Sequence, residues 1–165
     1  MITIKRAVPK QASILTNIAL SAKRHWGYPE IWIEIWRPQL TITPEFIAAA
    51  EVWVAEASEK PVGFFALTFP DERAVLEHFW IQPGNMGQGL GRRLFDHVLS
   101  RSREKNCTVL EIESDPNAQG FYERMGASKV GERVGEVDGQ PRILPVMEVN
   151  LSENAGRNHL MVSGE

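Results

Sequence analysis

The chain has 165 residues, a formal net charge of −3 and one cysteine, Cys107. This length suits one domain with its own core, and 43% hydrophobic with 24% charged residues excludes a wholly disordered chain. The mild acidity and the lack of any apolar run of about 18 residues argue against nucleic-acid and membrane partners. No apolar segment follows the N-terminal charges and no disulfide can form within the chain, so we expect a cytoplasmic protein.

The first third of the sequence predicts a strand and a helix, followed by a Trp-rich stretch. Residues 2–8 alternate apolar and polar side chains, and residues 10–23 carry apolar side chains at helical spacing. Residues 25–46 hold three prolines and, between residues 26 and 36, three tryptophans and a tyrosine. The prolines predict short helices separated by turns.

The rest of the sequence switches between the two-residue apolar spacing of strands and the helical spacing of three to four residues. A helix is expected at 90–105 and a short one at 117–125, ending before Gly126. Their order in the chain predicts a mixed α/β sheet in a single domain of residues 1–151, with 152–165 as a polar tail. The expected strands lie at 50–58, 62–69, 74–82, 108–114, 128–137 and 143–151.

A glycine-rich segment, QPGNMGQGLGR, connects the strand at 74–82 to the helix at 90–105. Backbone N–H groups of such a loop, at the positive end of a helix dipole, suit a phosphate or pyrophosphate. The Walker pattern fails because Leu90 follows Gly89, and the dinucleotide pattern fails because Arg92 takes its last glycine position. The third alternative for a phosphate-binding loop is the spacing of glycines in Met86-Gly87-Gln88-Gly89-Leu90-Gly91.

This spacing resembles the acyl-CoA pyrophosphate loop of the GNAT N-acetyltransferase superfamily. A second segment, SDPNAQGFYERMGA at 114–127, resembles the later motif of the same family, and the two stand in the family's order. The resemblance covers roughly residues 50–151 and departs from the family at Met86, where Gln or Arg is favoured, and at Asp115, where Asn is usual. Asn117 is the residue we expect to replace that Asn.

The resemblance implies a GNAT-like, mostly antiparallel central sheet of about seven strands with helices on both faces. It also implies acetyl-CoA as co-substrate, without a metal, and direct attack by a primary amine in a ternary complex. The residues implied to bind the cofactor are Phe79, Trp80, Ile81, Met86, Gly87, Gln88, Gly89, Leu90, Gly91, Arg92, Asp115, Asn117 and Phe121.

Catalysis by direct attack needs a base for the ammonium and an acid for the thiolate. The resemblance assigns the acid to Tyr122 and the oxyanion donor to a backbone N–H within residues 79–81. Glu77 is the first candidate for the base, because alternation along a strand places it on the same face as Phe79 and Ile81. His78 is predicted to point the other way and is the second candidate; a water chain and an ion-paired, non-catalytic Glu77 stay open.

Other residue types add further candidates. Glu111 and Glu113 on the next strand are alternative bases. Cys107 is interpreted as a small buried hydrophobe rather than a nucleophile. The four histidines have no spacing typical of a metal site.

Five tryptophans are many for one small domain. Trp26, Tyr28 and Trp32, with Trp36 nearby, alternate with the carboxylates Glu30 and Glu34, and aromatic faces with carboxylates suit a cationic amine. The acceptor, a small molecule or a peptide, is therefore expected near Trp26, Tyr28 and Trp32, while core packing and a homodimer contact remain alternatives for the tryptophans. The alternative function is a non-catalytic acyl-CoA-binding or sensor module.

Overall fold

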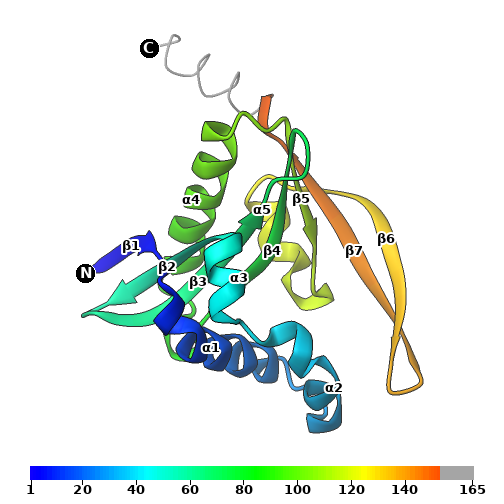
Figure 1. Cartoon of the computed structure of the whole chain (residues 1–165). Coiled ribbons are helices and arrows are strands. Elements are labelled where there is room, and N and C mark those ends of the chain that lie inside the picture. Colours follow the sequence, from blue (N-terminus) through cyan, green and yellow to red (C-terminus); the bar gives the residue numbers. More distant parts are fainter. Residues whose placement is uncertain (153–165) are drawn as a thin grey trace.

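The computed structural model describes residues 1–152 and is built around one seven-stranded sheet (Figure 1). The strand order is β1-β2-β3-β4-β5-β7-β6, and only the β4–β5 pair is parallel. The predicted tail lies outside the described residues from residue 153 onward. The strands are β1 (Ile2–Arg6), β2 (Glu51–Ala57), β3 (Lys60–Thr68), β4 (Arg73–Ile81), β5 (Val109–Glu113), β6 (Ser128–Val137) and β7 (Gln140–Asn150).

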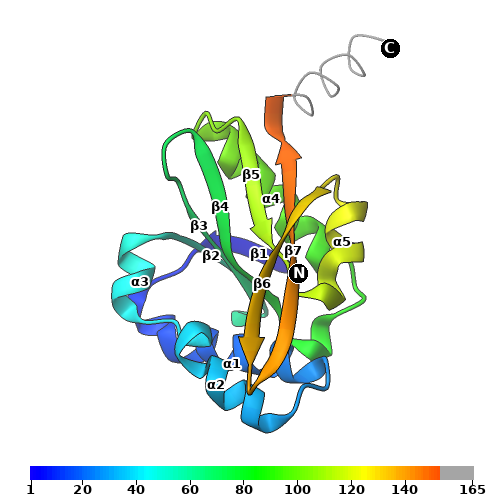
Figure 2. The same cartoon turned by 90° about the vertical axis from the view of Figure 1, so that its right-hand side faces the viewer.

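Helices cover both faces of this sheet (Figure 1, Figure 2). On one face lie α1 (Ala12–His25), α2 (Glu30–Leu40) and α3 (Pro44–Ala49), and on the other lie α4 (Leu90–Glu104) and α5 (Gln119–Arg124). The prediction of a mixed, mostly antiparallel sheet with helices on both faces is confirmed. Within residues 1–152, no helix has the length and apolar character needed to cross a bilayer.

Two cores form because successive residues of a strand point to opposite faces of the sheet. On β3, Phe65 is fully buried with Leu94 and Phe95 under α4, while Phe64 is fully buried with Leu15 and other residues under α1 to α3. The alternation along β3 therefore fixes one layer of helices on each side.

Several predicted boundaries differ from those of the structure, and two of the differences concern prolines. The prolines were expected to end helices, but α2 continues through Pro38 as far as Leu40, which is buried in the core beneath it. The turn expected around residues 59–61 lies at Ser58 and Glu59, both with positive φ, and Pro61 is already inside β3 opposite Glu56.

A bulge and a divergence of strands shape the middle of the sheet. Ala66 pairs with His78 and Leu67 with Leu76, so Glu77 is an extra residue in β4. The parallel pairing of β4 with β5 covers only residues 73–76 of β4, beyond which β4 pairs with β3 alone. The two strands therefore separate after the bulge, and the sheet opens there.

Candidate active site

A cavity of about 450 Å³ lies at this opening. It brings together residues from β4, the glycine loop, the end of β5, α5 and the end of α1 (Figure 1). Most of the residues predicted to bind the cofactor or to act in catalysis line it: Glu77, Phe79, Trp80, Ile81, Met86, Gly87, Gly89, Gly91, Arg92, Asp115, Phe121 and Tyr122.

The glycine loop turns into α4 through left-handed backbone conformations. Gly87 has φ +77° and Gly89, the residue before α4, has φ +80°, a region that costs a side-chain-bearing residue roughly 1–2 kcal/mol. The first helical bond runs from the Arg93 N–H to the Gly89 carbonyl at 3.2 Å. The three preceding N–H groups thus have no acceptor within the helix, and they lie where the cavity begins.

Gly91 permits close packing of α4 against α5. A Cβ at this position would lie 3.1 Å from Cε1 of Phe121, which is closer than such carbons normally approach. The glycine therefore lets the N-terminus of α4 sit beside the helix that carries Tyr122.

Three residues of the predicted cofactor set do not line the cavity: Gln88, Leu90 and Asn117. Leu90 is 4% exposed and its side chain packs in the core under α4, so only its backbone faces the loop. The Asn117 side chain donates from Nδ2 to the Tyr28 hydroxyl and to Asp115, both at 3.0 Å.

The segment of β4 along the cavity offers a free backbone edge. Phe79 and Ile81 pack into the core under α4, whereas Trp80 packs into the core on the other face. Within residues 1–152, no strand pairs with the β5-facing edge of this segment. Such an edge can bind an extended amide-containing ligand as an added strand does.

Tyr122 lies in an aromatic cluster at the wall of the cavity. Its ring centroid is 6.1 Å from that of Phe79, 5.8 Å from Phe95 and 5.4 Å from Phe121. Burial, with a smaller effect of the Asp115 charge, raises the pKa of Tyr122 well above its usual range. The phenol therefore keeps its proton at neutral pH.

The prediction that Glu77 shares a face with Phe79 and Ile81 was wrong. The bulge places Glu77 and His78 together opposite Ala66, so the alternation is broken at that point. The Glu77 carboxylate accepts a hydrogen bond from the Thr68 hydroxyl at 2.8 Å and stays exposed while lining the cavity.

His78 also lines the cavity, but its ring is engaged. Trp80 Nε1 donates to His78 Nδ1 at 2.9 Å, and burial lowers the pKa of His78 to about 4. The imidazole is neutral at physiological pH, and its Nδ1 lone pair is already used.

The other candidates from the sequence are placed as follows. Glu111 is paired with Arg73 at 2.8 Å, whereas Glu113 lines the cavity and contacts Arg133 at 3.3 Å. Cys107 is buried, and burial raises the pKa of its thiol. In the described part of the chain, no group of three or more His, Cys, Asp or Glu side chains is arranged to hold a metal ion.

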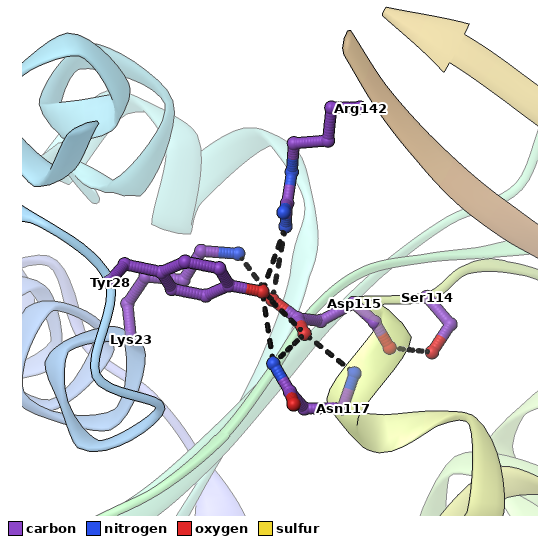
Figure 3. A network of polar contacts seen from close by, with 6 residues as sticks. All are labelled: Lys23, Tyr28, Ser114, Asp115, Asn117 and Arg142. Carbon is purple, nitrogen blue, oxygen red and sulfur yellow. Dashed lines mark hydrogen bonds and ion pairs between the residues drawn. The ribbon is translucent and has the colours of Figure 1, made fainter. Parts of the chain in front are cut away.

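Asp115 lines the cavity and is the centre of a polar cluster (Figure 3). Its carboxylate accepts from Lys23 Nζ at 2.7 Å, the Tyr28 hydroxyl at 3.0 Å and Arg142 at 3.2 Å. It also accepts from the Asn117 N–H at 2.8 Å. Burial alone would raise the pKa of Asp115, but the Lys23 charge and these hydrogen bonds outweigh it and hold the pKa below its usual value.

Lys23 and Arg142 were missed by the sequence analysis. Lys23 Nζ lies 4.4 Å and the Arg142 guanidinium 4.6 Å from the centre of the Trp36 ring, and both also lie over Tyr28. The aromatic group predicted to receive a cationic acceptor therefore already holds two cations of the chain itself. No spacing in the sequence signals the approach of Arg142, because it lies 114 positions from Tyr28 along the chain.

Trp26 and Trp32 are placed differently. Trp32 stacks on Tyr28 with ring centroids 5.9 Å apart and does not line the cavity. Trp26 lines the cavity and is 39% exposed. Of the three aromatic residues predicted near the acceptor, Trp26 alone borders this cavity.

Comparison with known proteins agrees with this arrangement. A family model described as an acetyltransferase (GNAT) domain matches residues 34–143. The chain belongs to the GNAT acetyltransferase family. The residues matched by the family model include β2 to β6, the glycine loop and Tyr122, so the cavity lies mostly within the GNAT domain.

Curated relatives of this GNAT domain act on different acceptors. It is 31% identical over 109 residues to the peptidyl-lysine N-acetyltransferase YjaB of Salmonella typhimurium, covering 66% of this chain and 70% of the relative. It is 24% identical over 139 residues to the 5-NmdU N-acetyltransferase of Pseudomonas phage PaMx11, covering 82% and 93% of the two chains.

Solved structures share the GNAT fold at low identity. The PaiA N-acetyltransferase of Thermoplasma acidophilum, in complex with coenzyme A, has a TM-score of 0.74 at 19% identity, with 91% of this chain and 99% of that chain covered. YncA of Salmonella typhimurium, with acetyl-CoA, has a TM-score of 0.67 at 17% identity, with 92% and 94% covered. These likenesses concern the fold.

Proposed function

We propose that this enzyme transfers an acetyl group from acetyl-CoA to a primary amine, by direct attack in a ternary complex within a single domain. The observation that carries the proposal is the continuity of the cavity. Its lining includes the N-terminus of α4, the free edge of β4, Tyr122 and Trp26. A pyrophosphate site, a strand-like binding edge and a buried proton donor thus line one space.

The residues of the cavity fit an acyl-CoA. Left-handed glycines and free N–H groups at the start of α4 suit the pyrophosphate, with Arg92 beside them. The β4 edge at residues 79–81 suits the amides of the pantetheine arm. Two solved neighbours, PaiA and YncA, hold coenzyme A and acetyl-CoA respectively, which supports the same ligand for this chain.

The catalytic roles follow from where the protons must go. Glu77, directly or through a water, takes a proton from the acceptor ammonium, because the free amine is the nucleophile. The amine nitrogen then bonds to the thioester carbonyl carbon, and a backbone N–H within residues 79–81 stabilises the oxyanion. After the attack the nitrogen carries a positive charge, and it releases its second proton through water to solvent. As the C–S bond breaks, Tyr122 gives its proton to the sulfur and recovers one from solvent.

The acceptor end of the cavity is suited to a cation. Glu77 and Glu113 are exposed carboxylates that line it, and Trp26 presents an aromatic surface beside them. The relatives named as a peptidyl-lysine N-acetyltransferase and a 5-NmdU N-acetyltransferase support an amine acceptor, either on a peptide or on a small molecule.

The test is acetyl-CoA turnover with an amine panel. The purified chain is incubated with acetyl-CoA and, in turn, an N-terminally blocked lysine peptide, spermidine and kanamycin, and free CoA thiol is followed with a chromogenic disulfide. We expect thiol release above the hydrolysis background with at least one amine, and an acetylated product of the right mass. Tight acetyl-CoA binding without turnover on a broad panel would instead indicate a non-catalytic binding module.

A further inference from the structure

The Asp115 carboxylate joins parts of the chain that are far apart in sequence. Lys23 lies in the last turn of α1, Tyr28 in the connection to α2, and Arg142 on β7 (Figure 3). The side chains of Lys23, Asp115 and Arg142 are only 11%, 9% and 13% exposed. Breaking a buried pair of this kind leaves an uncompensated charge and is strongly unfavourable, so the joined parts are held firmly together.

The same carboxylate has no capacity left for a further ligand. Oδ1 accepts from the Tyr28 hydroxyl and from two nitrogens of Asn117, and Oδ2 accepts from Lys23, Tyr28 and Arg142. A carboxylate offers about four lone-pair sites, and these six contacts use them. Asp115 borders the cavity but is not available as a cofactor ligand, which argues against the role predicted for it.

Trp26 lies between two residues that bind Asp115. Lys23 is three residues before it and Tyr28 two residues after it, and both donate to the same carboxylate. Gly27, with φ +84°, lets the chain turn between them. The short segment that carries Trp26 is therefore attached to Asp115 on both sides of this residue, through Lys23 and Tyr28.

Asp115 is itself held in place by the turn that follows it in the chain. It caps the short 3₁₀ turn Pro116–Ala118 by accepting the Asn117 N–H, and that turn leads directly into α5 with Tyr122. The wall that carries Tyr122 thus provides the rigid anchor, and the segment with Trp26 is the part attached to it.

We propose that Asp115 is a positioning residue that holds residues 23–28, and with them Trp26, as the acceptor-side wall of the cavity. The proposal deepens the acetyltransferase function and rests on it. Through this wall, Asp115 and Tyr28 determine how well the acceptor amine binds, while acetyl-CoA binding and the Tyr122 end of the cavity are unaffected by them.

The variant Asp115→Asn separates the role of Asp115 in holding residues 23–28 from its role in capping the turn before α5. Asparagine also caps helical turns, so it retains the bond from the Asn117 N–H while removing the charge that holds Lys23 and Arg142. Tyr28→Phe removes a single hydroxyl from the same cluster and is the milder variant. The control is Glu132→Gln on β6, which removes an exposed ion pair to Lys129 of similar length, 2.8 Å.

Two measurements are made on each variant. Steady-state kinetics use the blocked lysine peptide and acetyl-CoA, with acetyl-CoA affinity from calorimetry. Hydrogen exchange of the peptide covering residues 24–29 is followed by mass spectrometry without any acceptor. For Asp115→Asn we expect an amine KM about tenfold higher, kcat and acetyl-CoA affinity within about twofold, and faster exchange at 24–29. For Tyr28→Phe we expect an amine KM about threefold higher, with kcat and acetyl-CoA affinity again within about twofold and faster exchange at 24–29. For Glu132→Gln we expect all four quantities to match those of the wild type.

Two results would overturn the proposal. One is unchanged exchange at 24–29 in both cluster variants. The other is a loss of acetyl-CoA affinity in step with the rise in amine KM, since that makes Asp115 a cofactor ligand. If the wild type acetylates no amine, the acetyltransferase proposal fails, and the exchange measurement still decides whether Asp115 holds this segment.

Discussion

The two ends of the cavity are built in different ways. The glycine-loop end comes from residues 82–92 and the adjoining strand, and it depends on backbone conformation and free N–H groups. The proposed acceptor end joins Lys23, Tyr28, Asp115 and Arg142 through side-chain contacts across 92 and 114 positions of sequence. One end is therefore local and made of backbone, and the other is distant and made of charged side chains.

This difference has consequences for how each end responds to change. A backbone site tolerates varied side chains but not a residue that cannot adopt its φ values. A cluster of buried ions tolerates little change in charge, because each partner compensates the others. The glycine-loop end should therefore be sensitive to residues that change its backbone conformation, and the cluster around Asp115 to the loss of any one charge.

The largest effect is expected at the glycine-loop end. Gly89→Glu places a negative side chain at a φ of +80° beside the free N–H groups of α4, so acetyl-CoA affinity should fall by more than about 100-fold. Calorimetry with acetyl-CoA measures this. The control is Gly84→Ala in the same loop, which has ordinary φ and open space around its Cβ, and it should bind like the wild type. Equal losses in both variants would mean that the loop is simply intolerant of change.

The next largest effect is expected for Tyr122→Phe. Removing a general acid typically costs about 100-fold in kcat, whereas the ring that packs with Phe79 and Phe95 is kept. Acetyl-CoA affinity should therefore stay within about twofold of the wild type. Unchanged kcat would remove Tyr122 from the chemistry, and a collapse of affinity would make it a structural residue.

A smaller effect is expected for Glu77→Gln. If this carboxylate takes the ammonium proton, kcat/KM should fall about tenfold at pH 7 and recover as the pH rises toward the pKa of the amine. His78 is the weaker candidate for this base, since its Nδ1 accepts from Trp80 and a pKa of about 4 makes the ring a poor proton acceptor. The matched control is Glu113→Gln, a second exposed carboxylate of the same cavity. Equal losses would indicate that both act only through charge.

The sequence signals of the glycine-loop end are local. The glycine spacing, the following helix and the Phe121-Tyr122 pair are each contained within a few residues, and in the structure the loop and α5 both line the cavity. The face of Glu77 was mispredicted because a bulge adds a residue to β4, and nothing in RAVLEHFWI marks where the register shifts.

The acceptor end could not be predicted in the same way. Its aromatic residues were found, but the ions that fill the space between them come from α1 and β7, and pairing over such distances depends on the folded sheet. Tyr28 was accordingly assigned to the acceptor although its hydroxyl is bound to Asp115 and Arg142.

The smallest effect concerns stability and tests whether Tyr28 acts through the Asp115 charge. Tyr28→Phe removes a hydrogen bond to a buried carboxylate and should lower the unfolding free energy by about 1 kcal/mol at pH 7, or the Tm by roughly 2–4 °C. Because the pKa of Asp115 is held below its usual value in the folded protein, this stabilisation is present above about pH 4 and is lost as the carboxyl protonates at lower pH.

Thermal unfolding from pH 7 to pH 3 measures this difference. The matched control is Tyr122→Phe at the chain's other tyrosine, whose Tm difference should not follow the protonation of Asp115, since its phenol is neutral throughout this range. A Tm difference for Tyr28→Phe that stays constant down to pH 3 would mean that the hydroxyl contributes through packing alone. The acceptor end would then be held by Lys23 and Arg142 without it, and its dependence on charge would rest on those two ion pairs.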